Sequence, residues 1–218
     1  MKNYKTQFLN LALKHGALKF GRFELKSGRI SPYFFNAGLF NTGYAVAGLG
    51  QCYASALNKI DINFDMLFGP AYKGISLVAL TAAMLAENHG VDYPFAYNRK
   101  EAKDHGEGGT NIGATIKGRV LILDDVITAG TAATQAIKII HSEGAELAGI
   151  VVALDREEVG RESQLSAVQE LQNKIGVPVR SIVSLTDLIS HLESGSELEK
   201  FLPAVREYRE RYGAPSDE

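Results

Sequence analysis

The sequence predicts an α/β domain with a mainly parallel central sheet that is flanked by helices. Short runs rich in Val, Ile and Leu, such as 119–125 and 148–156, are typical of strands that are buried on both faces. Helical stretches separate these runs, and strands that alternate with helices indicate a parallel sheet with right-handed crossovers. In such sheets ligands bind beyond the carboxyl ends of the strands, so we expect the functional residues in the turns that follow the runs.

The first 60 residues are expected to form a small N-terminal region with a helix at each end. Phe8 and Leu11 fall on one face of a helix that begins near the N-terminus, which makes this helix amphipathic. A second helix is expected near 43–60. Between the two helices the segment 26–38 is rich in turn residues, so we expect it to be irregular.

Residues 61–185 carry five apolar runs that we interpret as the strands of the core. These runs are, in chain order, 66–69, 92–98, 119–125, 148–156 and 177–185. The apolar stretch 75–90 follows the first run and predicts a helix that packs on the sheet. Residues 186–218 form a charged segment that is expected to be helical and to cover an edge. The sequence contains neither an internal repeat nor an interdomain linker, so we interpret residues 1–218 as a single domain.

The composition argues against several classes of function. The chain has 218 residues and a net charge of −2, so its overall field gives no reason to expect nucleic-acid binding or binding to an anionic membrane. Cys52 is the single cysteine, which excludes an intrachain disulfide and a cysteine-based zinc site and fits a reducing cytoplasm. Asn10 and Lys14 interrupt the apolar N-terminal stretch, and no run approaches the roughly 18 apolar residues of a membrane span. We therefore expect a cytoplasmic protein without a signal peptide or a membrane segment.

The most informative pattern lies at 120–132. A run of apolar residues ends in the acids Asp124 and Asp125, and a turn of small and hydroxylated residues, 128–131, then precedes a helix. Such a turn presents unpaired backbone N–H groups and the positive end of the helix dipole, a geometry that suits a phosphate monoester. The two carboxylates offer acceptors that suit a diol or metal-bound water. The alternative, in which the acids only end a strand and Thr131 only caps a helix, does not account for the whole ordered string.

Other phosphate-binding motifs do not fit the sequence. Residues 113–118 have the glycine spacing of a P-loop, but Arg119 and Val120 follow in place of Lys and Ser or Thr. This segment also precedes a strand, whereas a P-loop follows one. No G-x-G-x-x-G motif opens a helix after a strand, so dinucleotide binding has no support.

Segment 120–132 resembles the signature with which the type I phosphoribosyltransferases bind 5-phosphoribosyl pyrophosphate (PRPP). The resemblance implies the fold of that family, with a small N-terminal hood region beside the parallel sheet. It also implies that the two acids hold the ribose hydroxyls while the following turn cradles the 5′-phosphate. The PRPP contacts that the resemblance implies within this segment are Asp124, Asp125, Val126, Ile127, Thr128, Ala129, Gly130, Thr131 and Ala132.

A basic, glycine-rich segment that follows the second expected strand is the other informative pattern. Its charges alone fit a solvated surface loop. Beside a PRPP site they fit better a lid that closes on pyrophosphate, excludes water and stabilises the leaving group. Residues 99–109 are similar to the catalytic lid of the orotate phosphoribosyltransferases. This resemblance implies a homodimer in which Arg99, Lys103 and His105 act on the partner's site and Lys100 acts on its own.

Three further segments resemble the same family, namely 23–36, 69–74 and the turn after the expected strand 148–156. Arg156 directly follows an expected strand, and the fork of an arginine is suited to a carboxylate. The residues that match the family's PRPP contacts in these segments are Lys26, Tyr72 and Lys73, and those that match its orotate contacts are Phe34, Phe35, Thr128 and Arg156.

The resemblance implies a displacement at the anomeric carbon of PRPP, with orotate as the nucleophile and pyrophosphate as the leaving group. Lys103, Asp124 and Asp125 are the residues that it assigns to catalysis. Mg²⁺ is the expected cofactor, held mainly by PRPP and water without direct protein ligands, because this ion usually keeps several waters. Two alternatives stay open, a phosphoribosyltransferase for another base and a PRPP-sensing regulator without catalysis.

Overall fold

The core of the fold is a six-stranded sheet with the strand order β5-β4-β3-β6-β7-β8. The structure, a computed structural model, describes residues 3–103, 109–127, 131–160, 163–194 and 197–215. The strands of this sheet are β3 (Met66–Gly69), β4 (Phe95–Lys103), β5 (Gly109–Gly113), β6 (Arg119–Asp124), β7 (Glu146–Asp155) and β8 (Val179–Ser184). All neighbouring strands pair in parallel except β4 and β5, which are antiparallel. The predicted α/β fold with a mainly parallel sheet is confirmed.

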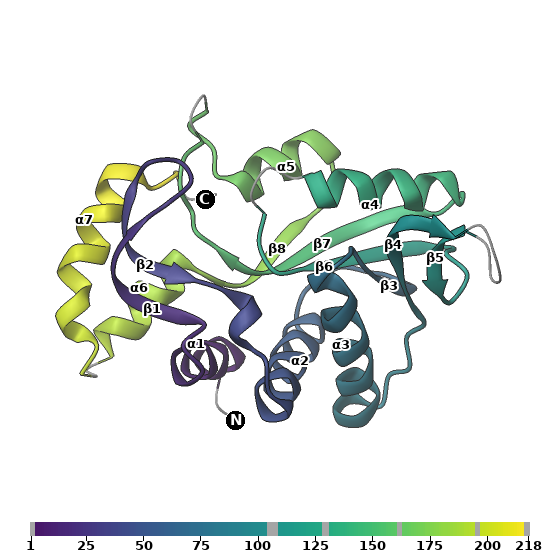
Figure 1. Ribbon diagram of the computed structural model, residues 1–218, viewed down its shortest axis with the longest axis horizontal. Helices are drawn as coiled ribbons and strands as arrows, with labels where there is room; N and C mark the ends of the chain where they lie inside the picture. The colour runs from purple at the N-terminus through teal and green to yellow at the C-terminus, as the bar shows by residue number, and fades with distance from the viewer. Residues whose placement is uncertain (1–2, 104–108, 128–130, 161–162, 195–196, 216–218) are drawn as a thin grey trace.

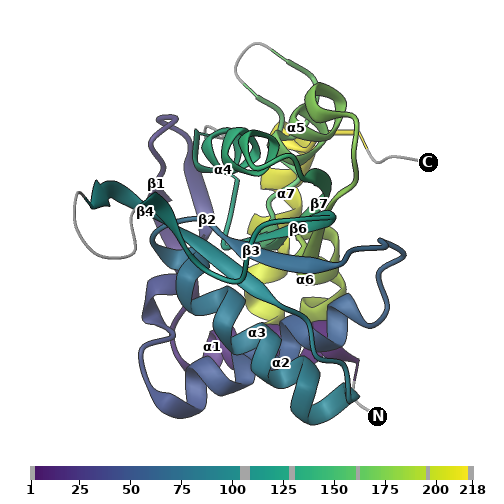
Figure 2. The same ribbon diagram turned by 90° about the vertical axis from the view of Figure 1, so that its right-hand side faces the viewer.

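Helices cover both faces of the sheet, as Figures 1 and 2 show. The helices α4 (Thr131–Ser142) and α5 (Ala167–Ile175) lie on one face, and α1 (Tyr4–Lys14), α2 (Gly43–Leu57) and α3 (Lys73–His89) lie on the other. Side chains of β6 alternate between two hydrophobic clusters. Leu121 and Leu123 belong to the cluster on the side of α1 to α3, whereas Val120 and Ile122 belong to the cluster on the side of α4. This alternation explains why the strand reads as a continuous apolar run.

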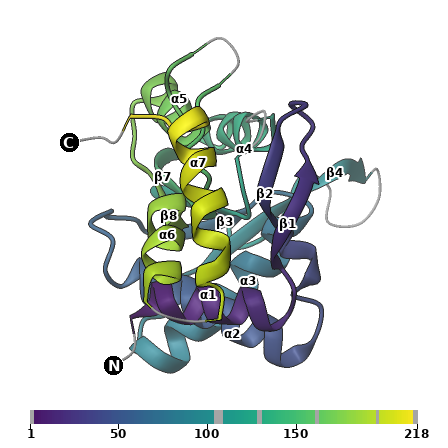
Figure 3. The ribbon, with the colours of Figure 1, turned by 90° about the vertical axis from the view of Figure 1, so that its left-hand side faces the viewer.

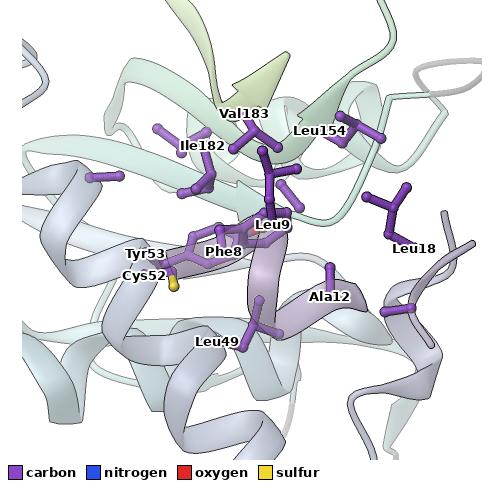
Figure 4. Packing of buried hydrophobic residues seen from close by; sticks show 14 of the residues in the cluster. Phe8, Leu9, Ala12, Leu18, Leu49, Cys52, Tyr53, Leu154, Ile182 and Val183 are labelled. Carbon is purple, nitrogen blue, oxygen red and sulfur yellow. The ribbon is translucent and has the colours of Figure 1, made fainter. Parts of the chain in front are cut away.

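The N-terminal helix α1 contributes side chains to the hydrophobic cluster on the side of α1 to α3. Figure 4 shows its apolar face packed against α2 and the sheet. The side chains labelled there are Phe8, Leu9 and Ala12 of α1, Leu49, Cys52 and Tyr53 of α2, Leu18 at the start of β1, Leu154 of β7, and Ile182 and Val183 of β8. Asn3 caps the helix by accepting a hydrogen bond from the Lys5 amide at 3.1 Å. The prediction of an amphipathic helix near the N-terminus is confirmed.

The segment 26–38 is not irregular, and that expectation was wrong. Most of it belongs to an antiparallel hairpin of β1 (Leu18–Glu24) and β2 (Ile30–Phe35). The turn residues that suggested irregular structure form the tight turn of this hairpin, where Gly28 adopts a φ of +79°. The aromatic run that follows is a strand, because its alternate residues face opposite sides and β1 supplies its backbone partners.

The C-terminal segment is helical, as predicted, and it supports this hairpin. It consists of α6 (Leu185–Glu193), the 3-10 helix η2 (Glu199–Phe201) and α7 (Leu202–Tyr212). Figure 3 shows α7 alongside β1 and β2. Tyr208 of α7 meets Tyr33 edge to face at 6.3 Å, and Phe201 stacks on Phe20 at 4.8 Å. The hairpin and α7 therefore form a hood with its own aromatic contacts.

The basic, glycine-rich segment is also more regular than the sequence suggests. The second expected strand, 92–98, begins at Phe95 and continues to Lys103, and β5 returns beside it. Gly113 allows the close pairing, because a Cβ at this position would lie 2.5 Å from the carbonyl oxygen of Phe95. Charges and glycines hide strand structure here, since a partner strand and not apolar periodicity holds β4 and β5 in place. No helix in the described part of the chain is long and apolar enough to cross a membrane.

Candidate active site

The predicted functional residues gather beyond the carboxyl ends of β3, β6 and β7. In Figure 1 these ends of β6 and β7 lie on the side of the sheet that faces the hood. Parallel pairing explains the convergence, because strands that run in the same direction end at the same edge. Residues that are far apart in the sequence thus become neighbours at this edge.

The acid pair ends β6, and backbone hydrogen bonds hold its turn in place. The Asp124 carbonyl accepts from the Tyr53 hydroxyl at 2.8 Å, and the Asp125 carbonyl accepts from the Ala153 amide at 2.8 Å. The Asp124 carboxylate accepts from the Asp125 amide at 2.9 Å. Burial raises the pKa of Tyr53, and the charges of Asp125 and Asp124 raise it further, so this hydroxyl keeps its proton and stays a donor.

Asp124 differs electrostatically from an ordinary surface acid. Burial raises the pKa of its carboxyl from 3.8 to about 6. The hydrogen bond from the Asp125 amide lowers this pKa and the negative charge of Asp125 raises it. A carboxylate with little water around it is a strong hydrogen-bond acceptor, which suits a residue that holds a sugar hydroxyl.

Lys73 and Asp125 form an ion pair across the site. Lys73 is the first residue of α3, and its side chain is 52% exposed, whereas that of Asp125 is only 10% exposed. The pair joins the turn after β3 to the turn after β6, although 52 residues separate the two in sequence. The structure thus brings together two residues that the sequence assigns to PRPP.

The turn between β3 and α3 depends on Gly69 and Gly74, whose backbones lie in close contact. A Cβ on Gly74 would lie 2.6 Å from Cδ of Pro70 and 2.8 Å from the carbonyl carbon of Gly69, so this position tolerates no side chain. The Ala71 amide donates to Oδ1 of Asn98 at 3.0 Å, which ties the turn to β4. Tyr72 is left 66% exposed beside Lys73. The turn is thus fixed through its backbone while its two predicted PRPP contacts stay accessible.

The predicted phosphate turn is described at its two ends. Val126 and Ile127 lie half-buried after the acid pair, each against a different hydrophobic cluster. Thr131 and Ala132 open α4 and are exposed, so the N-terminus of this helix, its positive end, is accessible. Thr128, Ala129 and Gly130 lie outside the described residues.

Arg156 follows β7 and contacts the hood. Its guanidinium donates to Oε1 of Glu158 and, at 2.9 Å, to Oγ of Ser31. It also lies over the ring of Tyr33, with Cζ 4.3 Å from the ring centroid. The residue predicted to bind orotate therefore connects the edge of the sheet with β2.

The predicted aromatic contacts differ in their surroundings. Phe34 is 40% exposed and stacks on Phe23 of β1 at 5.5 Å. The ring of Phe35 points to the other face of β2 and packs against Phe8 and Phe40, 6.0 and 6.4 Å away. Lys26 is exposed in the turn of the hairpin.

The predicted lid residues are described only in part. Arg99 lies on β4 and is half-buried, and its carbonyl accepts from Nδ2 of Asn98 at 3.1 Å. Lys100 and Lys103 continue β4, but the description does not extend to their side chains. His105 lies outside the described residues.

Comparison with known proteins identifies the family. The chain is 56% identical over 213 residues to the orotate phosphoribosyltransferase of Pseudomonas aeruginosa strain PAO1, an alignment that covers 98% of this chain and 100% of that protein. The enzyme of the same name from Yersinia enterocolitica is 55% identical with the same coverage. The chain belongs to the orotate phosphoribosyltransferase family.

Two further comparisons agree with this membership. Residues 45–182 match the family model of the phosphoribosyl transferase domain. The crystal structure of the orotate phosphoribosyltransferase from Francisella tularensis superimposes with a TM-score of 0.86 at 41% identity, covering 95% of this chain and 99% of that one. The family and the fold class that the sequence predicts are thus confirmed.

Three residues that contact the candidate site were missed by sequence reasoning. Tyr53 reads as one more core residue of α2, and nothing in the sequence signals its bond to the acid pair. Asn98 is a buried amide directly before Arg99, and a polar residue within a strand could have drawn attention. Glu158 lies two residues after Arg156, where an opposite charge on the same turn was a usable signal.

Proposed function

We propose that the chain transfers the 5-phosphoribosyl group from PRPP to orotate, which gives orotidine 5′-monophosphate and pyrophosphate in pyrimidine biosynthesis. The observation that carries this proposal is the convergence of Lys73, the acid pair and Arg156 at one edge of the sheet, in a member of the orotate phosphoribosyltransferase family. This edge offers cations for a pyrophosphate, acceptors for a ribose and an arginine for a carboxylate. The cytoplasmic location predicted from the sequence remains part of the proposal.

PRPP would bind across the turns that end β3 and β6. Asp124 and Asp125 accept from the ribose hydroxyls, and the N-terminus of α4 receives the 5′-phosphate. Binding also separates the Lys73–Asp125 ion pair, so that each partner gains a ligand group. The residues that we assign to PRPP are Lys26, Tyr72, Lys73, Lys100, the segment 124–132, and Arg99, Lys103 and His105 from the lid of the partner subunit.

Mg²⁺ is the cofactor that we assign to this site. Two carboxylates on adjacent residues, Asp124 and Asp125, fit an ion that keeps most of its waters and is held chiefly by its substrate. In the described part of the chain no group of three or more His, Cys, Asp or Glu side chains could hold a metal ion. When bound, Mg²⁺ supplies positive charge that stabilises the leaving pyrophosphate.

Orotate would bind between the hood and the end of β7. The guanidinium of Arg156 provides the donors for its carboxylate, Thr128 offers a hydroxyl, and the exposed ring of Phe34 offers an apolar surface. The ring of Phe35 is partly buried and packs against Phe8 and Phe40, so we assign its contact with orotate to its backbone.

The residues of the chain act mainly by placing charge around the anomeric carbon. Positive charge develops on the ribose ring as the bond to pyrophosphate breaks, and the acid pair lies where it can stabilise that charge. Lys103 of the lid stabilises the charge on the departing pyrophosphate. We propose that the chain forms a homodimer and that this lysine acts on the partner's site. Each lid then closes over the active site of the other subunit.

An assay with PRPP and Mg²⁺ tests the activity. Purified chain should reduce the absorbance of orotate, and the loss should depend on PRPP. Turnover of hypoxanthine, adenine or uracil without any loss of orotate would refute the proposed acceptor. PRPP binding without turnover of any base would refute catalysis altogether.

A further inference from the structure

A buried charge cluster connects the hood to the turn after β7. Arg156 and Arg29 both face Glu158, whose side chain is only 12% exposed. Arg156 pairs with Glu158 through both Nε and Nη2, at 2.7 and 2.6 Å, and Nη1 of Arg29 lies 3.7 Å from Oε2. One carboxylate is thus shared between an arginine of the hood and the arginine assigned to orotate.

Several contacts fix the plane of the Arg156 guanidinium. Glu158 holds one edge of it, Ser31 accepts from Nη2, and the ring of Tyr33 covers one face. A guanidinium has five N–H donors in a rigid fork, so contacts on one edge leave the geometry of the remaining donors fixed as well. Glu158 and Ser31 take the N–H groups of Nε and Nη2, so the N–H groups of Nη1 are the donors that this arrangement orients for a ligand carboxylate.

Arg29 ties the same cluster to the backbone of the turn. Its guanidinium donates to the carbonyl oxygens of Val159 and Gly160, at 2.9 and 3.4 Å, and lies over the ring of Tyr212 at 4.8 Å. Arg29 begins the return of the hairpin towards β2. The hood and the turn after β7 are therefore linked through Glu158 as well as through the backbone.

The turn that carries Arg156 and Glu158 is itself held firmly. Glu157 between them adopts a φ of +49°, a left-handed conformation that is uncommon for a residue with a side chain. Its amide donates to Asp155, and its carboxylate accepts from the amide and hydroxyl of Thr186 at 2.8 and 2.6 Å. Unfavourable backbone conformations persist where surrounding contacts determine them, often at ligand-binding turns.

The net charge of the cluster can be balanced by one anion. Two arginines face one glutamate, so the three residues carry one excess positive charge in largely buried surroundings. Glu157 directs its carboxylate to Thr186 instead. A buried unbalanced charge is costly, and a single carboxylate from a ligand would balance it. Orotate has one carboxylate, whereas uracil, the same ring without this group, has none.

We propose that Glu158 is the positioning residue that sets the recognition of the orotate carboxylate. It fixes the orientation of the Arg156 guanidinium for that group and leaves the cluster with one excess positive charge, which one ligand carboxylate balances. This inference rests on the proposed function, because it concerns the same orotate site. Glu158 acts through Arg156 and does not itself touch the substrate.

Kinetics of Glu158→Gln test the proposal. Glutamine keeps the shape of the side chain but removes the charge that holds Arg156 in place. The added positive charge of the cluster would by itself favour the orotate carboxylate and lower the KM for orotate. We therefore expect the loss of positioning to outweigh it, so that the KM for orotate rises at least tenfold while the KM for PRPP changes less than threefold. The ratio of kcat/KM for orotate to that for uracil should fall at least fivefold, and Glu158→Asp should recover part of it. Glu193→Gln is the matched control, since Glu193 pairs with Arg206 in an exposed Arg–Glu bridge on the hood side of the chain.

The outcomes separate this inference from the proposed function. Wild-type protein without orotate turnover removes the function itself. An active wild-type protein with an unchanged KM for orotate in Glu158→Gln, or with equal rises of both KM values, refutes the positioning role and leaves the function standing. If Glu158→Gln does not fold, Glu158→Asp is measured instead, because it keeps the charge and shifts only the carboxylate. A larger rise in the KM for orotate than in the KM for PRPP, with a lower ratio of kcat/KM for orotate to that for uracil, then supports the positioning role, and no change in either refutes it.

Discussion

The hydroxyl of Tyr53 on α2 donates a 2.8 Å hydrogen bond to the backbone carbonyl of Asp124 at the end of β6. Tyr53 is fully buried, and its helix packs on the sheet beneath the acid pair. A core residue therefore determines where the backbone of the proposed ribose clamp lies. This link gives core packing a direct influence on the geometry of the site.

Tyr53→Phe should weaken both the fold and the binding of PRPP. The substitution leaves the Asp124 carbonyl buried without its donor, so we expect a loss of about 1–2 kcal/mol in the free energy of unfolding. The KM for PRPP should rise several-fold. Urea unfolding and steady-state kinetics measure the two effects, and Tyr44→Phe is the control because Tyr44 is 92% exposed. Unchanged stability would show that the hydrogen bond contributes nothing.

Asp125→Asn should separate catalysis from stability. Asparagine keeps the size and polarity of the buried side chain and removes a charge whose desolvation is costly, which offsets the lost pairing with the half-exposed Lys73. The free energy of unfolding should therefore change by no more than about 1 kcal/mol. The kcat/KM for PRPP should fall at least a hundredfold, because the ribose loses a charged acceptor. Asp65→Asn breaks the exposed Asp65–Arg119 pair and should leave activity unchanged. If Asp125→Asn is as active as Asp65→Asn, the carboxylate of Asp125 has no role in catalysis.

Asp124 should destabilise the fold above about pH 6. Its folded pKa, about 6, lies above the ordinary 3.8, so the folded state binds the proton more tightly and stability falls as the pH rises between these values. Asp124→Asn should therefore raise the free energy of unfolding at pH 7.5, on the order of 2 kcal/mol, and have little effect near pH 3.5. Urea titrations at the two pH values measure this, with the exposed Asp61→Asn as control. A gain in the free energy of unfolding near pH 3.5 without a gain at pH 7.5 would contradict this prediction.

Asn98 should couple the pyrophosphate turn to the lid strand. Its amide accepts from Ala71 and donates to the Arg99 carbonyl. Asn98→Asp keeps the first bond, loses the second and adds a buried negative charge beside the turn that we assign to pyrophosphate. We therefore expect the KM for PRPP to rise about tenfold with a smaller change for orotate. Asn88→Asp on the exposed side of α3 makes the same chemical change away from the site. Equal effects on both substrates would argue for a general loss of structure.

Complementation should reveal whether the lid acts across a dimer. Lys103→Ala and Asp125→Asn should each be nearly inactive. If each lid serves the partner's site, a mixture of the two variants forms heterodimers with one intact site, and about a quarter of wild-type activity should return after subunit exchange. Activity that stays at the level of the separate variants would place the lid in its own site. Sedimentation of the wild-type protein checks that it is a dimer.

Much of the core was predictable because its signals are local. The strand 66–69 was placed to the residue, and the strand after 119 ends one residue earlier than expected. A buried parallel strand reads as an apolar run whatever its neighbours are, so no long-range information is required. The hood hairpin, the part of β4 beyond residue 98 and the strand β5 were missed for the opposite reason. Their backbone partners, and not their own side-chain patterns, stabilise them.

By itself, the sequence determined the fold class, the family and the types of group that the site contains. The acids after β6, the lysine after β3 and the arginine after β7 are all visible as residues that follow strands. Only the tertiary structure decided which of them meet: Lys73 with Asp125, Tyr53 with Asp124, and Arg156 with Glu158 and Ser31 of the hood. The physical reason is that strand order and helix packing, which depend on the whole chain, set the direction of each side chain at the shared edge of the sheet.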